Sequence, residues 1–414
     1  MKKKSKYWRI VLILVILSVL SAVTCFFPSA CDWFTDNIHG IVSGGIARVT
    51  GLLPVSVGEI ILMIGAAMLV LGILFLILLI FLRKKAGYRK FCAGWFKTWL
   101  MGFVIVLFLS MPTWLIPLCG HVLGKDNAGK RTDYSVKELT ALYAYTIEGL
   151  NKAAAEIEIA ADGSVQFPTD EELQPHITEA LTALSGEYPR LAGYYPPVKI
   201  ALTSDFYSRM NIGGFTFPPS AEATRDKYSL PYFIPVLNAH ELSHVKGFMK
   251  ENEANFISQL ALSKSDNPYL RFSAFDNMRS YVYEKWQPAS EAYLNTLAER
   301  GEITLPVMPE IRKGMSQEER VQLKKSIEER ERITQEVFRL PDISERAYQI
   351  YNAAHGVREQ VYNEDSHPVD NMPAVQEALE TVNKAHWDLY DIYMQENSYD
   401  GVVLLLLQHF EGMY

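Results

Sequence analysis

The stretch NAHELSHVKGFMKENEANFI, residues 238–257, places two histidines four residues apart, with a glutamate beside the first and two more glutamates downstream. Residues four apart share one face of an α-helix, so His240 and His244 can direct ring nitrogens toward one ion while Glu241 projects beside it. A hydrolytic zinc site needs three protein ligands, an open position for water and a base that is not a ligand. The pattern therefore predicts that His240 and His244 bind Zn²⁺ and that Glu241 is the catalytic base.

The residues after the second histidine offer two choices for the third ligand. Gly247 follows His244 by three residues, where a glycine can end a helix in a left-handed turn, and a second helix with apolar residues at helical spacing follows. Glu251 and Glu253 fall in the first turn of that helix. Glu251 comes first after the turn and precedes Asn255 by four residues, which puts a ligand and a side chain that orients it on one face. We predict Glu251 as the third ligand and Glu253 as the alternative.

An ordinary structural interpretation of the same residues exists. Histidines occur on the surface of amphipathic helices, and acidic side chains favour helix N-termini through the helix dipole. The metal interpretation is preferred because all of these groups follow one another within a single stretch.

Composition restricts the classes of protein to consider. The chain has 414 residues and 49% hydrophobic residues, which are concentrated in the first third, so a membrane part and a soluble part are expected. A net charge of −7 argues against binding to nucleic acid, which needs clustered Lys and Arg. All four cysteines lie in or near the apolar part, at Cys25, Cys31, Cys92 and Cys119. A metal in the C-terminal part must therefore use histidine and carboxylate ligands.

Three apolar runs, at about 8–27, 59–82 and 94–118, are long enough to cross a bilayer as helices. Basic residues precede the first run and fill the loop between the second and third, whereas the 32–58 connector carries only Arg48. Because basic loops stay in the cytoplasm, the N-terminus is predicted inside. The first run lacks a small-residue cleavage site, which favours a membrane anchor over a signal peptide.

This topology divides the chain into two predicted domains. Residues 1–119 form a membrane domain, and residues 120–414 form an extracytoplasmic domain at the plasma membrane. The connector between the first two runs is predicted to be interfacial or weakly helical. The near absence of charges within the apolar runs argues against a transporter.

The C-terminal part has mostly helical periodicity, as in YSVKELTALYAYTIEGLNKAAAEI and TDEELQPHITEALTALSGEY. Ser316 and Glu319 form a capping box that opens a charged helix over 316–338. The stretch VKIALTSDFYSRMNIGGFTFPP departs from this periodicity and predicts two short strands around a turn. Its second half, GFTFPP, is the expected edge strand, where an extended substrate can add by backbone pairing.

Two resemblances support these interpretations. ENEAN resembles the ExxAD or ExxAN element that follows HExxH in gluzincin-type zinc metallopeptidases, which implies that Glu251 is a zinc ligand and Asn255 its hydrogen-bonding partner. The chain more closely resembles a family of bacterial membrane proteins known only as a domain of unknown function, with the pattern HELxHxxGFxxExEANF after several transmembrane helices. That resemblance extends to GGFTFPPSAEA, to RFSAF and to YDIYMQENSYDGVVLLLLQHF. It implies a zincin-like fold.

We therefore expect an α+β, mainly α protein, with N-terminal transmembrane helices followed by a mostly helical zincin-like domain with a small sheet. The expected function is that of a membrane-anchored zinc metallopeptidase with a peptide or protein substrate and the lipid bilayer as its partners. A noncatalytic membrane receptor or scaffold that retains a metal-stabilised zincin fold is the alternative. Residue type alone selects four candidates for an oxyanion donor, which are Tyr351, His355, Arg358 and Tyr362.

Overall fold

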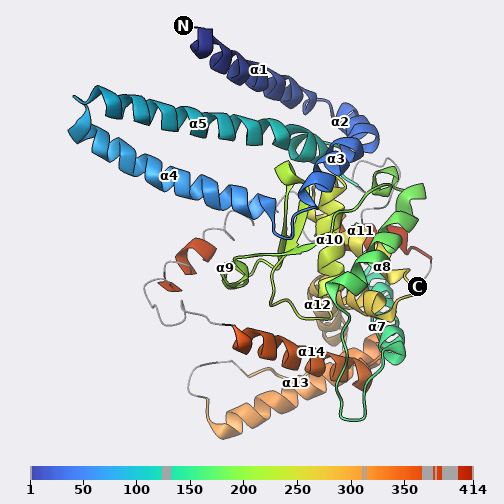
Figure 1. Cartoon of the computed structure of the whole chain (residues 1–414). Helices are drawn as coiled ribbons and strands as arrows, with labels where there is room; N and C mark the ends of the chain where they lie inside the picture. Colours follow the sequence, from blue (N-terminus) through green and yellow to red (C-terminus); the bar gives the residue numbers. More distant parts are fainter. Residues whose placement is uncertain are drawn as a thin grey trace.

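Three long apolar helices extend from one side of the molecule (Figure 1). The computed structural model describes residues 2–123, 131, 133–309, 312, 315–365, 376–377, 380–384 and 400–412. The long helices are α1 (Lys2–Thr24), α4 (Val57–Leu82) and α5 (Ala86–Ser110), and α5 continues through a π-helical segment, η2 (Met111–Leu115), into α6 (Ile116–Leu118). By length and composition, the segments Lys6–Thr24, Val57–Leu82 and Ala86–Leu118 can each cross a membrane. The three predicted apolar helices are confirmed, and the third begins earlier than expected.

The connector between the first two long helices is itself helical. It forms α2 (Pro28–Phe34), the π-helical η1 (Thr35–His39) and α3 (Gly40–Thr50). The imidazole of His39 bridges the membrane part and the body, because its two nitrogens lie 3.1 Å from the carbonyl oxygen of Pro112 and 3.0 Å from that of Val245. The connector therefore packs against the rest of the protein.

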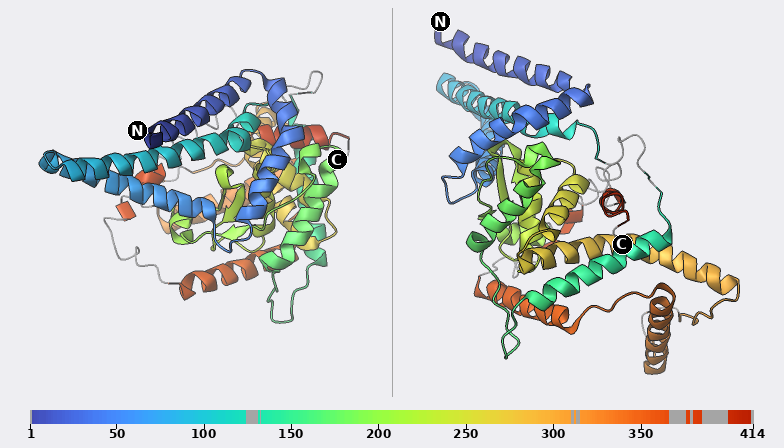
Figure 2. Two further views of the ribbon diagram at one scale, coloured as in Figure 1. Left: turned by 45° about the horizontal axis from the view of Figure 1, so that its top comes forward. Right: turned by 90° about the vertical axis from the view of Figure 1, so that its right-hand side faces the viewer.

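The body is mainly helical, as predicted. Its helices are α7 (Val136–Glu156), α8 (Asp170–Ala183), α9 (Ser204–Arg209), α10 (Ile234–Val245), α11 (Glu251–Ser263), α12 (Pro268–Glu299), α13 (Gln317–Phe338), α14 (Glu345–Glu364) and α16 (Asp400–His409). Capping boxes open α7, α8 and α13, the last at Ser316 and Glu319 as expected. Helices α7 and α12 lie side by side (Figure 2) and contribute much of the buried core, together with α10 and α11.

A three-stranded sheet lies beside α10, and it differs from the predicted hairpin. The strands are β1 (Lys199–Ile200), β2 (Gly214–Phe217) and β3 (Glu222–Arg225), in the spatial order β1-β3-β2. The two expected strands, β1 and β2, do not pair with each other, because β3 lies between them, parallel to β1 and antiparallel to β2. The segment between β1 and β2 contains helix α9 in place of the predicted turn.

The sequence of β3, Glu-Ala-Thr-Arg, lacks the alternation of apolar residues that marks a strand, although all four residues are buried. Its polar side chains are buried with partners: Thr224 donates a hydrogen bond to the hydroxyl of Ser56, and Arg225 pairs with Asp170. Burial of β3 thus depends on polar partners from distant segments, which a single-sequence pattern does not contain.

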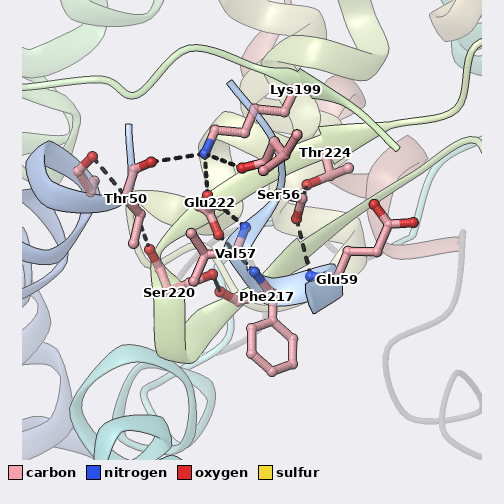
Figure 3. A network of polar contacts seen from close by, with 12 residues as sticks. Thr50, Ser56, Val57, Glu59, Lys199, Phe217, Ser220, Glu222 and Thr224 are labelled. Carbon is pink, nitrogen blue, oxygen red and sulfur yellow. Dashed lines mark hydrogen bonds and ion pairs between the residues drawn. The ribbon is translucent and has the colours of Figure 1, made fainter. Parts of the chain in front are cut away.

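Glu222 of β3 anchors the start of the long apolar helix α4 to the sheet (Figure 3). One carboxylate oxygen accepts from the backbone N–H of Val57 at 3.2 Å, and the other accepts from Gly58 at 2.9 Å. Lys199 of β1 pairs with the same carboxylate and donates to the carbonyl oxygens of Thr50 and Val55, both at 2.9 Å. A carboxylate at a helix N-terminus satisfies free N–H groups and interacts favourably with the helix dipole.

A second carboxylate makes the reciprocal connection. Glu59, in the first turn of α4, accepts hydrogen bonds from the backbone N–H groups of Leu202 and Thr203, both at 2.7 Å, directly before α9. The buried carboxylates of Glu222 and Glu59 therefore connect α4 with the sheet from both sides. These contacts fix the position of the first turn of α4 relative to β2 and β3.

We expect Glu222→Gln to lower the free energy of unfolding by about 3–5 kcal/mol, because it leaves the Lys199 ammonium buried without its counter-charge. Denaturant unfolding of the detergent-solubilised full chain measures this loss. Adding Lys199→Met should recover part of it. The control is Glu329→Gln, which breaks only the exposed pair with Arg332 and should cause no measurable change. Equal effects of the two single variants would contradict the anchoring role of Glu222.

Candidate metal centre

Helix α10 presents His240, Glu241 and His244 to one cavity. Pro235 lies in the first turn of α10, where the backbone N–H that proline lacks would have no partner within the helix. The apolar side chains of α10, Val236, Ala239 and Leu242, belong to the core. Because most of α10 is buried, the polar side chains of HELSH lie inside the protein and not on a solvated face. This placement argues against the interpretation as surface histidines on an amphipathic helix.

The predicted turn after His244 is present. Gly247 has a φ of +91°, in the left-handed region that favours glycine, and its N–H donates to the carbonyl oxygen of His244. An added Cβ at this position would also lie 2.8 Å from the Thr35 side chain of η1. Helix α11 then begins at Glu251, so the turn brings this carboxylate back toward α10.

The structure brings together His240, His244 and Glu251 as one cluster of possible metal ligands. The two Nε2 atoms lie 3.0 Å apart, and the Glu251 carboxylate oxygens lie 3.2 Å from that of His240 and 3.6 Å from that of His244. Tetrahedral zinc with bonds of about 2.0–2.1 Å places its ligand atoms about 3.3 Å from one another. The three observed separations scatter around that value, so the donor set fits zinc in both chemistry and spacing.

The Nδ1 atoms of His240 and His244, which point away from the cluster, differ in their hydrogen bonds. The Nδ1 of His244 lies 2.7 Å from the carbonyl oxygen of Phe248, an acceptor that fixes the proton on Nδ1 and leaves Nε2 free to bind a metal. The buried Nδ1 of His240 has no hydrogen-bond partner within the described residues. Only one of the two rings is therefore oriented by a direct protein contact of this kind.

Glu241 lies beside the cluster and is held by strand β2. The hydroxyl of Thr216 lies 2.9 Å from the carboxylate of Glu241 and also 2.9 Å from its backbone carbonyl oxygen. Gly214 allows this approach, since an added Cβ there would lie 2.8 Å from a carboxylate oxygen of Glu241. The sequence predicts Gly214 and Thr216 only as part of the substrate-binding edge strand GFTFPP and does not predict their contacts with Glu241. The Gly-Gly pair before Phe215 is the signal that could have indicated a close backbone approach.

Glu253 lies on the other side of the α11 start. Its carboxylate accepts a hydrogen bond of 2.9 Å from the backbone N–H of Leu123 and lies 3.7 Å from the ammonium of Lys250. It therefore takes part in attaching α11 to the segment that follows the third long helix. Asn255, one turn after Glu251, lines the same cavity as the histidines.

The cavity around the cluster has a volume of about 580 Å³. The four oxyanion candidates chosen by residue type do not line it. Tyr351 donates to Asp276, Arg358 donates to the carbonyl oxygen of Tyr228, and Tyr362 packs against the Tyr228 ring. The polar side chains of Asn277 and Tyr281 from α12 do line the cavity, together with residues of β2 and Trp114.

Burial and mutual contact change the acidities of these groups. Burial raises the pKa of Glu241 above its ordinary value, although both histidines oppose the shift. Burial alone would lower the pKa of His244, but the Glu251 carboxylate outweighs it and raises this pKa to about 9. Burial would raise the pKa of Glu251, yet the charge of His244 and the contacts with both rings bring it well below the usual range. The metal-free cluster thus holds a proton on His244 at neutral pH.

We expect zinc binding at pH 7 to release about one proton per ion, because His244 must lose its proton to become a ligand. Apparent zinc affinity should rise about tenfold per pH unit up to about pH 9, the pKa of His244, and level off above it. Isothermal titration calorimetry in two buffers of different ionisation enthalpy counts the protons. At pH 9 the count should fall to about half a proton per ion, since about half of the His244 rings are already neutral at their pKa. A heat that is independent of the buffer would contradict this expectation.

A comparison of the chain with protein families places it in one of them. A family model described as "Protein of unknown function (DUF3810)" matches residues 34–351. The chain belongs to the DUF3810 family. The DUF3810 match runs from the end of α2 into α14, so it includes the His240 cluster, the sheet and the second and third long helices. No curated protein and no solved structure matches the chain. The predicted membership of a domain-of-unknown-function family is confirmed, and the resemblance to gluzincins stays a prediction.

Proposed function

We propose that this protein is a membrane-anchored, zinc-dependent metallopeptidase. The observation that carries the proposal is the convergence of three donor groups, His240, His244 and Glu251, within a cavity that also holds Glu241 beside them. A site that serves only to bind metal has no need of a fixed carboxylate that is not a ligand. The hydrogen bond from Thr216 supports the role of Glu241, because a base must keep one position.

The side chains of this site have two different roles in the proposed hydrolysis of a peptide. A zinc ion held by the three donors would lower the pKa of bound water and polarise a peptide carbonyl. Glu241 accepts a proton from the attacking water and passes it to the departing amine. Its pKa is raised by burial, which brings the carboxylate closer to the acidity that proton transfer near neutral pH requires.

Strand β2 supports binding of an extended substrate. It lies at the edge of the sheet, and its residues Gly214, Phe215 and Thr216 form one wall of the cavity. An edge strand offers backbone groups to which a peptide can pair as an additional strand. We assign the substrate to peptides or proteins on this basis.

The proposal is tested on the purified full chain, since α4 completes the packing of the sheet. Elemental analysis should find about one zinc per chain, and digestion of a broad peptide library should be blocked by a chelator and restored by zinc. Zinc without any hydrolysis would favour the alternative of a noncatalytic receptor or scaffold. Absence of both zinc and hydrolysis would contradict the proposal.

For the cellular location, we propose a multi-pass protein of the bacterial plasma membrane with its N-terminus in the cytoplasm and the site on the outer face. The three apolar helices and the basic residues at Arg83, Lys84, Lys85, Arg89 and Lys90 support it. An epitope tag placed in the turn at residues 83–85, between α4 and α5, should become accessible only after the membrane is opened. The same tag at the turn around Gly301 should react in intact spheroplasts. The reverse pattern of labelling would overturn this orientation.

A further inference from the structure

One wall of the cavity belongs to the membrane part of the chain. Trp114, in η2, lines the cavity together with His240 and Glu241. Trp114 lies in the apolar segment Ala86–Leu118, four residues before its last residue. At 1.5 Å per residue, it is about 6 Å from the end of that helical segment. Tryptophan favours the membrane–water interface, and this side chain is 44% exposed. The cavity therefore adjoins the body end of the third helix that is long and apolar enough to cross a membrane.

The edge strand β2 leads from the catalytic carboxylate to the membrane helices. At its start, the backbone of Gly214 lies against Glu241. At its end, Phe217 packs onto Gly58 in the first turn of α4, where an added Cβ would lie only 2.5 Å from the Phe217 side chain. The turn that follows, η5 (Pro218–Ser220), contacts α3, α4 and α5. A peptide that pairs with β2 therefore runs between Glu241 and the membrane surface.

Exposed apolar side chains mark the same level on the connector and its flanks. They lie at the body end of the long helices, in segments too short to cross a membrane, and they are Phe26, Phe27, Trp33, Ile41, Val49, Leu52 and Leu53. Apolar and aromatic side chains on short helices beside membrane spans are typical of segments that lie in the interface. The connector, Trp114 and the end of β2 thus share one boundary with the lipid.

We propose that the cavity takes an extended segment of another membrane-anchored polypeptide, close to the point at which that polypeptide leaves the bilayer. This inference rests on the proposed peptidase function and names its substrate class. Strand β2 has four residues, or about 13 Å of extended chain at about 3.3 Å each, so a peptide bond at Glu241 lies about four residues from the end of β2 that packs against α4. The reaction consumes one water and yields a carboxylate on one fragment and an amine on the other.

The test uses the full chain in phosphatidylethanolamine–phosphatidylglycerol vesicles with added zinc. The probe is a library of randomised ten-residue peptides in three forms. The first carries a diacyl lipid anchor with a two-residue spacer, the second carries the same anchor with a thirty-residue Gly-Ser spacer, and the third is free in solution. Both anchored forms have the same surface concentration, so a difference between them reports distance from the membrane and not enrichment on it.

We expect the short-spacer form to be cleaved at least about ten times faster than the long-spacer and free forms, which corresponds to about 1.4 kcal/mol. Mass spectrometry of its products should place the cleaved bonds in the half of the randomised segment that is nearer the anchor. Trp114→Ala should reduce the ratio of short-spacer to long-spacer cleavage without loss of zinc. The control Trp8→Ala, an exposed tryptophan of α1 that neither lines the cavity nor belongs to the connector, should keep this ratio.

Failure of this inference and failure of the proposed function give different results. If all three forms are cleaved at equal rates and the cleavage depends on Glu241, the proposal of a membrane-anchored substrate is wrong and the proposed peptidase function stands. Faster cleavage of the free form would lead to the same conclusion. If none of the three forms is cleaved in a Glu241-dependent manner, the peptidase proposal and the inference that rests on it both fail.

Discussion

Glu241→Gln should lower peptide hydrolysis by about 100- to 10,000-fold and leave the zinc content unchanged. Glutamine has nearly the same shape but cannot accept a proton at neutral pH, so the variant removes the base and keeps the packing. The Thr216 hydroxyl can still donate to the amide oxygen at this position, which should preserve the local structure. Library digestion and elemental analysis of the same preparation measure the two effects separately.

Two further variants make this result interpretable. His240→Ala removes a ring that contributes to the cluster, and it should lose zinc and hydrolysis together. Glu284→Gln makes the same chemical change at an exposed position on α12 and should alter neither. Unchanged turnover in Glu241→Gln would mean that Glu241 is not the base, whereas loss of zinc in this variant would mean that it is a ligand.

The second large effect concerns the choice between Glu251 and Glu253. Glu251→Ala should weaken zinc binding by several powers of ten, since its carboxylate is the group that lies 3.2 Å and 3.6 Å from the two histidine Nε2 atoms. Glu253→Ala should keep the zinc but lower the melting temperature, because it leaves Lys250 without its carboxylate and the N–H of Leu123 without its acceptor.

Zinc titration against a competing chelator, at a temperature at which both variants are folded, separates these outcomes. If Asn255 orients Glu251, as the resemblance of ENEAN to ExxAN implies, Asn255→Ala should fall between them with a loss of about 10- to 100-fold. Loss of the metal in Glu253→Ala with retention in Glu251→Ala would reverse the assignment.

The long apolar helices and the residues of the HELSH and ENEAN stretches were both predicted from sequence, and both depend on interactions between residues close together in the chain. The long apolar helices follow from length and hydropathy, and the i, i+4 spacing of His240 and His244 places both on one face wherever a helix forms. The turn at Gly247 follows from the freedom of glycine at positive φ, here +91°. The preference for Glu251 over Glu253 rested on its position four residues before Asn255, on its place directly after the Gly247 turn and on the resemblance of ENEAN to ExxAN, and the structure places the Glu251 carboxylate beside both rings.

The features that sequence reasoning missed depend on contacts between distant segments. Strand β3 was not recognised, because its buried Glu222 and Thr224 are compensated by Lys199 and by the start of α4, and no local pattern shows such partners. The oxyanion candidates were chosen by residue type and lie outside the cavity, whereas Asn277 and Tyr281 line it.

The long apolar helices, the helical body and the order of the groups in HELSH and ENEAN could be read from the chain alone, because periodicity and spacing act within a few helical turns. The contact of Thr216 with Glu241, the anchoring of α4 by Glu222 and the position of Trp114 in the cavity wall are visible only in the folded structure. Each of these contacts joins residues at least 25 positions apart in the sequence. Such contacts form because a buried polar group without a hydrogen bond, or an apolar group left in water, is unfavourable. That requirement belongs to the whole packed structure and not to any single stretch of the chain.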